Sequence, residues 1–276
     1  MRITFVRPDM NSLPSGDAME PLVFAILAAL TPPDVDTSLY DDRIEPVPLD
    51  EPTDLVAMTV ETYSARRAYD LADAYRRRGV PVVMGGFHPS MVPDEALQHA
   101  DAVVVGEAEG AWPRVVEDAR AARLRGVYRQ TGRSSLDGLR VDRRIIHAKR
   151  YAPIGLVQAS RGCRFACDFC SIHAFYGSDV RRRPAGDIVA EIEALDRRLV
   201  LIVDDNIFTD PAHAEELFRR LVSLRIRWAC QVSLDIAANP ALLDLMARSG
   251  CVAALVGFES LDEANLAQMK KRWNLA

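Results

Sequence analysis

The sequence has few aromatic residues and no long hydrophobic run. Phe, Trp and Tyr make up 7% of it. The longest apolar stretch, Leu22 to Leu30, is much shorter than the roughly 20 residues that cross a bilayer. Residues 1–6, Met-Arg-Ile-Thr-Phe-Val, have the pattern of a β-strand and lack the features of a secretory leader. We therefore expect neither a transmembrane segment nor export, and we predict a cytoplasmic protein.

Cysteine is also scarce, and charge is nearly balanced. Five cysteines are an odd number and three are crowded together, which argues against a disulfide framework and for a reducing compartment. The other two, Cys230 and Cys251, lie in apolar runs and are expected in the core. The net charge of −5 gives no general attraction to nucleic acid. With 276 residues, 49% of them hydrophobic, the chain can bury two ordinary cores.

The three crowded cysteines form the motif Cys163-x3-Cys167-x2-Cys170. A cubane iron–sulfur cluster has one more iron than this loop has thiolates, so one iron would stay open to a small molecule. The motif follows a strand-like run, residues 154–158, which places the cysteines at the carboxyl end of a strand. Barrel-type sheets carry their chemistry at that end. Ligand type and position together predict a reactive cluster.

A second interpretation of the same cysteines stays open. His173 lies three positions after Cys170. Cys163, Cys167, Cys170 and His173 could therefore form a closed, structural Cys3His zinc site. The chain would then be a non-catalytic binding protein, a Rossmann-like sensor domain joined to a zinc knuckle.

The alternation of strands and helices in residues 1–122 predicts an α/β domain with a parallel, Rossmann-like sheet. The expected strands are residues 3–6, 37–40, 55–60, 80–84 and 102–105, and the expected helices are residues 18–30, 65–78 and 110–123. Ligands of such sheets bind beyond the carboxyl ends of the strands. At those ends, Gly85 and Gly86 would let the backbone approach a bulky ligand closely, and Thr59 could hydrogen-bond its polar tail.

Residues 123–150 are rich in Arg and in turn-forming residues, which predicts a solvated linker. From residue 151 to residue 276, a second βα series suits part of a βα barrel. Its expected strands are residues 154–159, 200–204, 226–235 and 252–259, and its expected helices are residues 187–197, 211–224 and 240–248. At two strand ends, Asp204 or Asp205 could hold an ammonium group, and Glu259 could accept two ribose hydroxyls.

The cysteine motif, with Phe169 just before its last cysteine, resembles that of the radical S-adenosylmethionine (radical SAM) enzymes. Residues 84–90 and 105–110 resemble the amino-terminal domain of the subgroup that binds cobalamin. The resemblance implies a [4Fe–4S] cluster, held by the three motif cysteines, that cleaves S-adenosylmethionine to a 5′-deoxyadenosyl radical. It further implies cobalamin-dependent methylation, or another radical modification, of an unreactive carbon. The expected architecture is a cobalamin-binding, Rossmann-like domain followed by an incomplete radical SAM partial (β/α) barrel.

The resemblance also assigns cofactor contacts and partners. The residues that would contact S-adenosylmethionine are Phe169, Glu259 and one of Asp204 and Asp205, and those that would contact cobalamin are Thr59, Gly85 and Gly86. None of the five histidines stands in the Asp-x-His-x-x-Gly motif that supplies a lower axial ligand, so we expect cobalamin without that histidine. The implied partners are a small-molecule substrate and an electron donor such as flavodoxin or ferredoxin, with no nucleic acid.

The family's core usually has six βα units, whereas this sequence ends after a fourth strand and part of its helix. We therefore expect a truncated polypeptide. Its fourth strand would be an open edge at a place that is normally paired.

Overall fold

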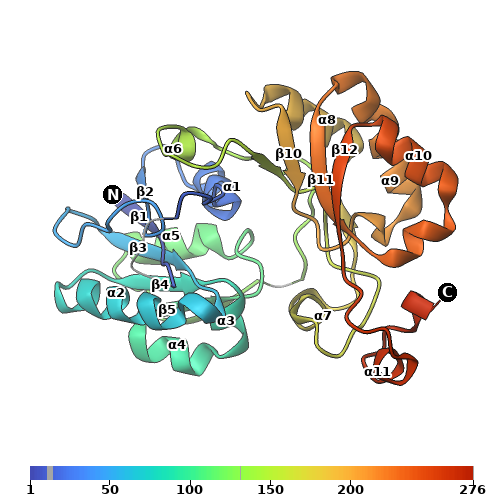
Figure 1. Cartoon of the computed structure of the whole chain (residues 1–276). Helices are drawn as coiled ribbons and strands as arrows, with labels where there is room; N and C mark the ends of the chain where they lie inside the picture. Colours follow the sequence, from blue (N-terminus) through green and yellow to red (C-terminus); the bar gives the residue numbers. More distant parts are fainter. Residues whose placement is uncertain (11–14, 131, 276) are drawn as a thin grey trace. The chain divides into compact units, whose positions relative to one another are not determined.

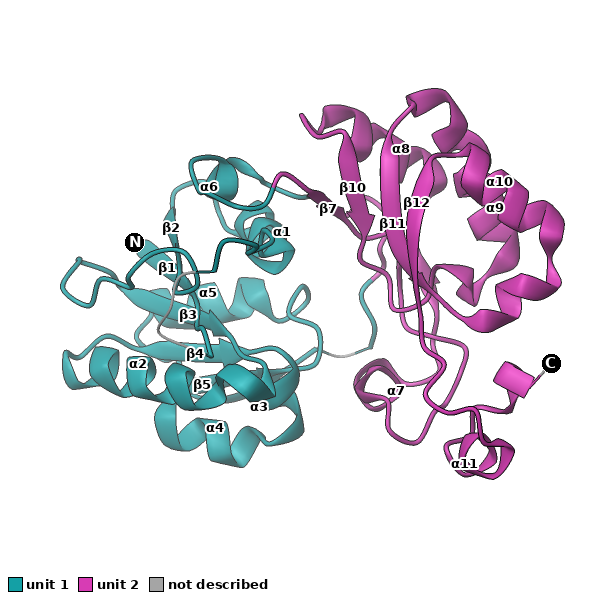
Figure 2. Cartoon of the chain, in the orientation of Figure 1, with its two compact units in different colours: residues 1–134, 140–152 teal, residues 135–139, 153–276 magenta. Residues whose placement is uncertain are grey.

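Two parallel sheets organise the chain, one in each of two units (Figure 2). The computed structural model describes residues 1–10, 15–130 and 132–275. Unit 1 comprises Met1–Ser134 and Arg140–Ala152, and unit 2 comprises Ser135–Leu139 and Pro153–Ala276. None of the helices in the described part of the chain has the length and apolar character that crossing a bilayer requires.

Unit 1 contains a six-stranded sheet in the order β2-β1-β3-β4-β5-β6, with every pairing parallel. The strands are β1 (Arg2–Arg7), β2 (Asp36–Asp41), β3 (Leu55–Thr59), β4 (Val82–Gly85), β5 (Ala102–Val105) and β6 (Gly126–Arg129). The strand order reverses between β1 and β3, and open α/β sheets bind ligands beyond the carboxyl ends at such a point. The predicted α/β class and parallel sheet are confirmed.

Helices cover both faces of this sheet (Figure 1). They are α1 (Leu22–Leu30), η1 (Thr62–Ser64), α2 (Ala65–Arg77), α3 (Phe87–Met91), α4 (Pro93–His99), α5 (Trp112–Arg120) and α6 (Arg144–His147). Successive side chains of a strand point to opposite faces. Accordingly, Phe5 packs in the core with Phe24 of α1 and Trp112 of α5, whereas Val6 packs in the core with the apolar side of α2.

The predicted linker, residues 123–150, contains regular structure that packs on unit 1. The strand β6 pairs with β5 along its whole length, and α6 lies against α1. The amide of Asp142 donates to the carbonyl of Ala25 at 2.8 Å, and Arg143 forms an ion pair with Glu20. Because β6 is a short edge strand with one buried apolar side chain, Tyr128, its sequence carries little periodic signal. The strand β6 is therefore stabilised by its hydrogen bonds to β5 and cannot be recognised from its own sequence.

Unit 2 contains a four-stranded parallel sheet in the order β12-β11-β10-β7. The strands are β7 (Gly155–Val157), β10 (Leu199–Ile202), β11 (Arg227–Val232) and β12 (Cys251–Val256), with a separate antiparallel pair of β8 (Ser160–Arg161) and β9 (Arg181–Arg182). The helices are α7 (Ser171–Tyr176), α8 (Ala185–Ala194), η2 (Ile207–Thr209), α9 (Pro211–Leu221), η3 (Val222–Leu224), η4 (Leu234–Ala238), α10 (Pro240–Arg248), α11 (Glu263–Gln268) and η5 (Arg272–Leu275). The expected βα series from residue 151 is therefore present.

The core of unit 2 lies between its sheet and the helices α8, α9 and α10 (Figure 1). Trp228 of β11 is fully buried there, packs against Phe218 at a centroid distance of 5.2 Å, and donates its indole N–H to the carbonyl of Ser249. The last strand, β12, forms one edge of the sheet, and its Leu255 is 67% exposed. The fourth strand is thus an edge strand, as the sequence predicts.

The amino terminus of helix α10 carries a capping residue whose contribution to stability can be tested. The side chain of Asn239 accepts a hydrogen bond from the amide of Leu242 at 3.1 Å, and Pro240 occupies the first helical position. We expect Asn239→Ala to lower the free energy of unfolding by about 1 kcal/mol. Urea denaturation measures this, with Asn239→Asp as the control that keeps a capping oxygen. Equal stability of the Ala and Asp variants would contradict the assigned cap.

Candidate functional site

The cysteine loop, residues 162–170, connects β8 to α7 at the carboxyl edge of the unit 2 sheet. Its three cysteines, Cys163, Cys167 and Cys170, are free and half-buried. The loop begins at Gly162, which has a φ of +88°, and a Cβ atom there would lie 2.4 Å from the carbonyl oxygen of Asp179. Only glycine fits this turn, because any side chain would collide with the backbone of Asp179.

The two acidic residues after β10 hold the start of this loop. Asp204 is 1% exposed, and its carboxylate accepts hydrogen bonds from the amide of Ala159 at 2.6 Å and the hydroxyl of Ser160 at 2.5 Å. The carboxylate of Asp205 accepts from the amide of Gly162 at 3.0 Å. Both carboxylates therefore position the chain that leads into the cysteine loop. The predicted contact of one of them with an ammonium group stays a prediction.

The burial of Asp204 leads to a pH prediction. Burial raises the pKa of its carboxyl from 3.8 to about 6, although hydrogen bonds from Ser160 and Ala159 oppose this. The native state then holds a proton between about pH 4 and pH 6 that the unfolded state has lost, so stability falls as pH rises through this window. We expect this group to contribute a decrease of at most about 3 kcal/mol.

Urea unfolding of the wild type and of Asp204→Asn, measured at several pH values from 4.5 to 7, isolates this contribution. The asparagine cannot titrate, so the difference in unfolding free energy between the two proteins should change across the window and level off above it. A difference that is constant with pH would show that Asp204 keeps an ordinary pKa in the folded protein.

Asn206 connects the first cysteine to a neighbouring strand. Its side-chain amide donates to the hydroxyl of Ser233 at 3.0 Å and lies 3.7 Å from the Cys163 sulfur. Its side-chain carbonyl accepts from the amides of Phe208 and Ser233, both at 3.1 Å. Asn206 is not among the functional residues predicted from the sequence. Its position directly after Asp204 and Asp205 at a strand end was the one feature of the sequence that pointed to it.

Further contacts fix the middle of the cysteine loop. The amide of Arg164 donates to the hydroxyl of Thr209 at 2.8 Å, and its guanidinium forms an ion pair with Asp235. The ring of Phe165 stacks on that of Trp273 at a centroid distance of 3.8 Å. The loop is thus held by the chain that follows β10, by the chain that follows β11 and by the segment near residue 273.

Phe169 and Glu259, both predicted to contact S-adenosylmethionine, lie near one lysine. The Lys271 ammonium is 3.0 Å from a carboxylate oxygen of Glu259 and 5.8 Å from the ring centroid of Phe169. Burial raises the pKa of the Cys167 thiol, and the charge of Lys271 opposes this effect. The structure therefore brings the ends of the loop and of β12 together around Lys271, a residue that sequence reasoning missed.

The donor set of the cysteine loop fits an iron–sulfur cluster by its chemistry. It consists of sulfur ligands from one loop, and Cys167 is close enough to Cys163 and Cys170 for their charges to act on its thiol. In the part of the chain that the structure describes, no group of three or more His, Cys, Asp or Glu side chains lies in an arrangement that could hold a metal ion. This finding applies equally to the three loop cysteines and to the Cys3His set with His173, so the cluster is favoured over the zinc site by the chemistry of the donors and not by their geometry.

At the carboxyl edge of the unit 1 sheet, the predicted residues Thr59, Gly85 and Gly86 lie together. Thr59 ends β3, Gly85 is its partner in β4, and Gly86 follows with a φ of +103°. A Cβ atom on Gly86 would lie 2.8 Å from the carbonyl oxygen of Val60 and 3.1 Å from the Thr59 hydroxyl, whereas one on Gly85 would make ordinary contacts. Glycine is therefore required at position 86 by the packing of two strand ends.

His88 follows these glycines and is engaged by neighbouring side chains. Its imidazole Nε2 lies 2.9 Å from the hydroxyl of Tyr69 and 3.4 Å from the carboxylate of Glu95, and its side chain is 12% exposed. Its amide donates to the carbonyl of Val60 at 3.1 Å. This arrangement gives His88 a role in packing α3, the short helix that follows β4.

Two charged residues that sequence reasoning missed lie at the same edge. Arg7 ends β1, and its buried Nε has no hydrogen-bond partner among the described residues. Burial raises the pKa of the Glu61 carboxyl, and the charges of Arg7 and His88 oppose this. A cavity of about 240 Å³ lies at the carboxyl ends of β5 and β6 and is lined in part by Gly106, Glu107 and Arg129. The carboxyl edge of unit 1 is thus polar and hollowed.

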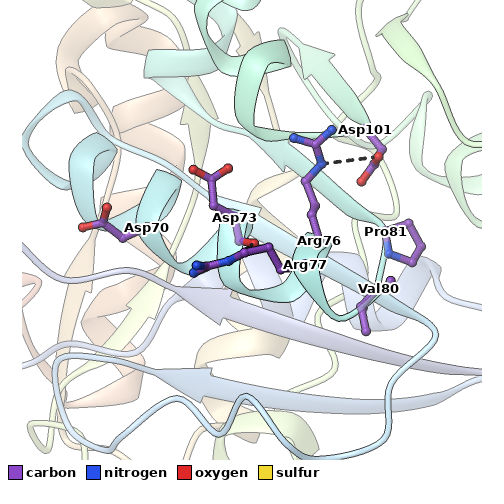
Figure 3. A pocket seen from close by; sticks show the side chains of 8 residues that line it. Asp70, Asp73, Arg76, Arg77, Val80, Pro81 and Asp101 are labelled. Carbon is purple, nitrogen blue, oxygen red and sulfur yellow. Dashed lines mark hydrogen bonds and ion pairs between the residues drawn. The ribbon is translucent and has the colours of Figure 1, made fainter.

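A larger pocket of unit 1, about 740 Å³ in volume, lies at the other end of the strands (Figure 3). Asp70, Asp73, Arg76 and Arg77 of α2 line it together with the chain just before β4 and β5. The Arg76 guanidinium is 3.4 Å from the carboxylate of Asp101 and also donates to the carbonyl of Gln98. Asp73 forms an ion pair with His99, and the Arg77 guanidinium donates to the backbone carbonyl of Asp73, so Arg76, Asp73 and Arg77 each have a partner within unit 1.

Taken together, these features define a class of protein: a Rossmann-type sheet followed by a parallel sheet whose carboxyl edge holds a three-cysteine loop. Residues 26–116 match the B12 binding domain, and residues 157–276 match the Radical SAM superfamily. The chain thus combines a domain of the B12-binding family with a domain of the Radical SAM superfamily.

Individual relatives agree with this assignment. The chain is 30% identical over 273 residues to bacteriochlorophyllide d C-12(1)-methyltransferase of Chlorobaculum tepidum, an alignment that covers 94% of this chain and 60% of the relative. It is 26% identical to hopanoid C-2 methylase of Rhodopseudomonas palustris, over 93% of this chain and 52% of the relative. The chain thus spans about 60% or less of the length of these relatives.

The fold is shared with a solved structure. The radical S-adenosylmethionine methyltransferase TsrM from Kitasatospora setae, solved with cobalamin and a [4Fe–4S] cluster bound, superimposes with a TM-score of 0.78 at 17% identity. The superposition covers 98% of this chain and 63% of that protein. This similarity supports the two-sheet fold.

Proposed function

We propose that this chain serves in cobalamin-dependent radical methylation of an unreactive carbon, with a [4Fe–4S] cluster, S-adenosylmethionine and cobalamin as cofactors. The observation that carries the proposal is the cysteine loop at the carboxyl edge of unit 2, anchored by Asp204, Asp205 and Asn206, in a chain that also has a B12-binding domain. Thiolates in one loop fit a cube with an open iron.

In this proposal, Cys163, Cys167 and Cys170 hold the cluster. When bound, the cofactors supply the difficult chemistry: an electron from the cluster splits the sulfonium, and cobalamin carries a methyl group. The protein holds and orients them. Phe169 packs near the nucleoside, and Glu259 accepts hydrogen bonds from ribose hydroxyls. Asp204 and Asp205 fix the start of the cysteine loop beside the end of β10.

In unit 1, we assign the cobalamin site to Thr59, Gly85 and Gly86. Gly86 brings the ends of β3 and β4 into contact, and this shapes the surface that a bulky corrin would meet. His88 is held by Tyr69, so we propose that cobalamin binds without a histidine ligand from α3. The cation of Arg7 and the buried carboxyl of Glu61 would border the site.

The proposed substrate is a small molecule, since the relatives named above act, by their names, on a bacteriochlorophyllide and on hopanoids. Nucleic acid is not a proposed partner, because the net charge is −5. An electron donor such as flavodoxin or ferredoxin would reduce the cluster. The free thiols of the chain suit a reducing compartment, and the cytoplasm is the one we propose.

Anaerobic reconstitution with ferrous iron and sulfide tests the proposal. We expect iron, sulfide and a broad visible band near roughly 400 nm. With dithionite and S-adenosylmethionine, the protein should release 5′-deoxyadenosine and methionine, which chromatography with mass detection identifies. Stoichiometric zinc and a colourless protein would instead support the sensor with a structural zinc site.

A further inference from the structure

The side chain of Lys271 is mostly covered, although the side chains of Phe169 and Glu259 beside it are largely exposed or half-exposed. The Lys271 side chain is 12% exposed, and its nitrogen lies 3.0 Å from a Glu259 carboxylate oxygen and 5.8 Å from the centre of the Phe169 ring. A buried charge is costly unless it is paired, and an aromatic face adds attraction to a cation. Lys271 therefore holds in one place the two side chains assigned to the nucleoside part of S-adenosylmethionine.

The chain around Lys271 bridges the cysteine loop and the end of β12. The amide of Asp168 donates to the carbonyl of Met269 at 3.2 Å. On the other side, the side-chain amide of Asn274 donates to the carbonyls of Gly257 and Phe258, both at 3.1 Å. The residues on either side of Lys271 are thus hydrogen-bonded to both segments, Met269 through its backbone and Asn274 through its side chain.

The ion pair between Lys271 and Glu259 occupies the space that a side chain at position 257 would fill. A Cβ atom at Gly257 would lie 2.4 Å from a Glu259 carboxylate oxygen and 3.0 Å from the Lys271 nitrogen. Glu259 itself has a φ of +62°, an uncommon conformation for a residue with a side chain. Uncommon backbone conformations persist where the surrounding contacts hold them, and here the ion pair supplies such a contact.

Resting on the proposed function, we propose that Lys271 is a positioning residue for the nucleoside sulfonium: it locks Glu259 and Phe169 in their binding geometry and places a fixed positive charge beside the cysteine loop. A thiolate-bound cluster is anionic, and a nearby cation raises its reduction potential. Lys271 thus influences both the affinity for S-adenosylmethionine and the reducibility of the cluster.

The experiment uses the whole reconstituted chain and compares Lys271→Met with Lys270→Met. Lys270 is the matched control, because it is 70% exposed and its ion pair with Asp168 is open to solvent. EPR-monitored redox titration gives the midpoint potential, and the change of the EPR signal on adding S-adenosylmethionine gives its dissociation constant. We expect Lys271→Met to bind about tenfold more weakly and to shift the potential to more negative values, and Lys270→Met to behave like the wild type.

A second variant keeps the test decisive if Lys271→Met does not assemble a cluster. Glu259→Gln removes the negative partner and leaves the lysine charge, so the potential should shift to more positive values while affinity for S-adenosylmethionine falls. Wild-type affinity and potential in Lys271→Met, or in Glu259→Gln, would overturn the inference. A wild-type protein that assembles no cluster would refute the proposed function itself, which separates the two failures.

Discussion

Anaerobic reconstitution of the Cys167→Ser variant is expected to yield almost no cluster and no cleavage of S-adenosylmethionine. The cysteine loop offers one thiol fewer in this variant, and a serine hydroxyl replaces a thiolate poorly as a ligand of iron. The cube would then depend on Cys163 and Cys170 alone. We expect iron content and cleavage rate to fall by a factor on the order of 10² or more, since loss of supporting groups alone costs 10–100-fold at metal sites.

Cys251→Ser is the matched control for this prediction. Cys251 is also a free, half-buried thiol of unit 2, but it lies in the edge strand β12 rather than in the cysteine loop. Its variant should retain the visible band, the iron and sulfide content and the cleavage of S-adenosylmethionine. A Cys167→Ser protein with wild-type iron content, or equal losses in the two variants, would show that the cysteine loop is not the cluster site.

Elements with strong local signals could be predicted closely from the sequence. The predicted bounds of α10 agree with the structure, because Asn239 and Pro240 mark its start and Gly250 follows its end. By contrast, α3, α4, β8 and β9 were not predicted. They have between two and seven residues each, which is too few for hydrophobic periodicity, and long-range contacts stabilise them.

The candidate site shows the same division between local and long-range information. Cysteines, acidic residues and paired glycines at strand ends are recognisable by type, and the structure places the predicted ones at the carboxyl edges of the two sheets. Lys271, however, stands in the run Met-Lys-Lys-Arg, residues 269–272, which has the composition of a solvated basic surface. Only the fold reveals that the side chain of Lys271 is mostly covered and paired with Glu259, while that of its neighbour Lys270 is exposed.

Asp204 and Asp205 show that the alternation of side chains along a strand does not extend past the end of the strand. In a strand, successive side chains point to opposite faces, so at most one of the two acids would be expected to face the cysteine loop. The strand β10 ends at Ile202, and Asp204 and Asp205 lie beyond its end. Both carboxylates are therefore free to turn toward the residues that lead into the loop, and both accept hydrogen bonds from them.

For unit 1, the largest expected effect is loss of cobalamin binding in the Gly86→Ala variant. Gly86 has a φ of +103° and a ψ of −170°, a region that residues with a Cβ atom rarely occupy. The added methyl group would also lie within 3.0 Å of backbone atoms of Val60. The chain after β3 must move to relieve this contact, and that movement displaces Thr59 from Gly85. We expect affinity for hydroxocobalamin to fall at least about tenfold, with a stability cost of about 1–3 kcal/mol.

Gly79→Ala separates the effect on the site from the cost of the backbone conformation. Gly79 has a φ of +79°, but no atom lies within 4 Å of a Cβ built there, and it precedes β4 at the opposite end of the sheet. This variant should lose some stability and keep its affinity, as measured by absorbance titration with hydroxocobalamin and by urea unfolding. If Gly86→Ala bound as tightly as Gly79→Ala, cobalamin could not depend on the packed ends of β3 and β4, and the assignment of Thr59, Gly85 and Gly86 to its site would have to be abandoned.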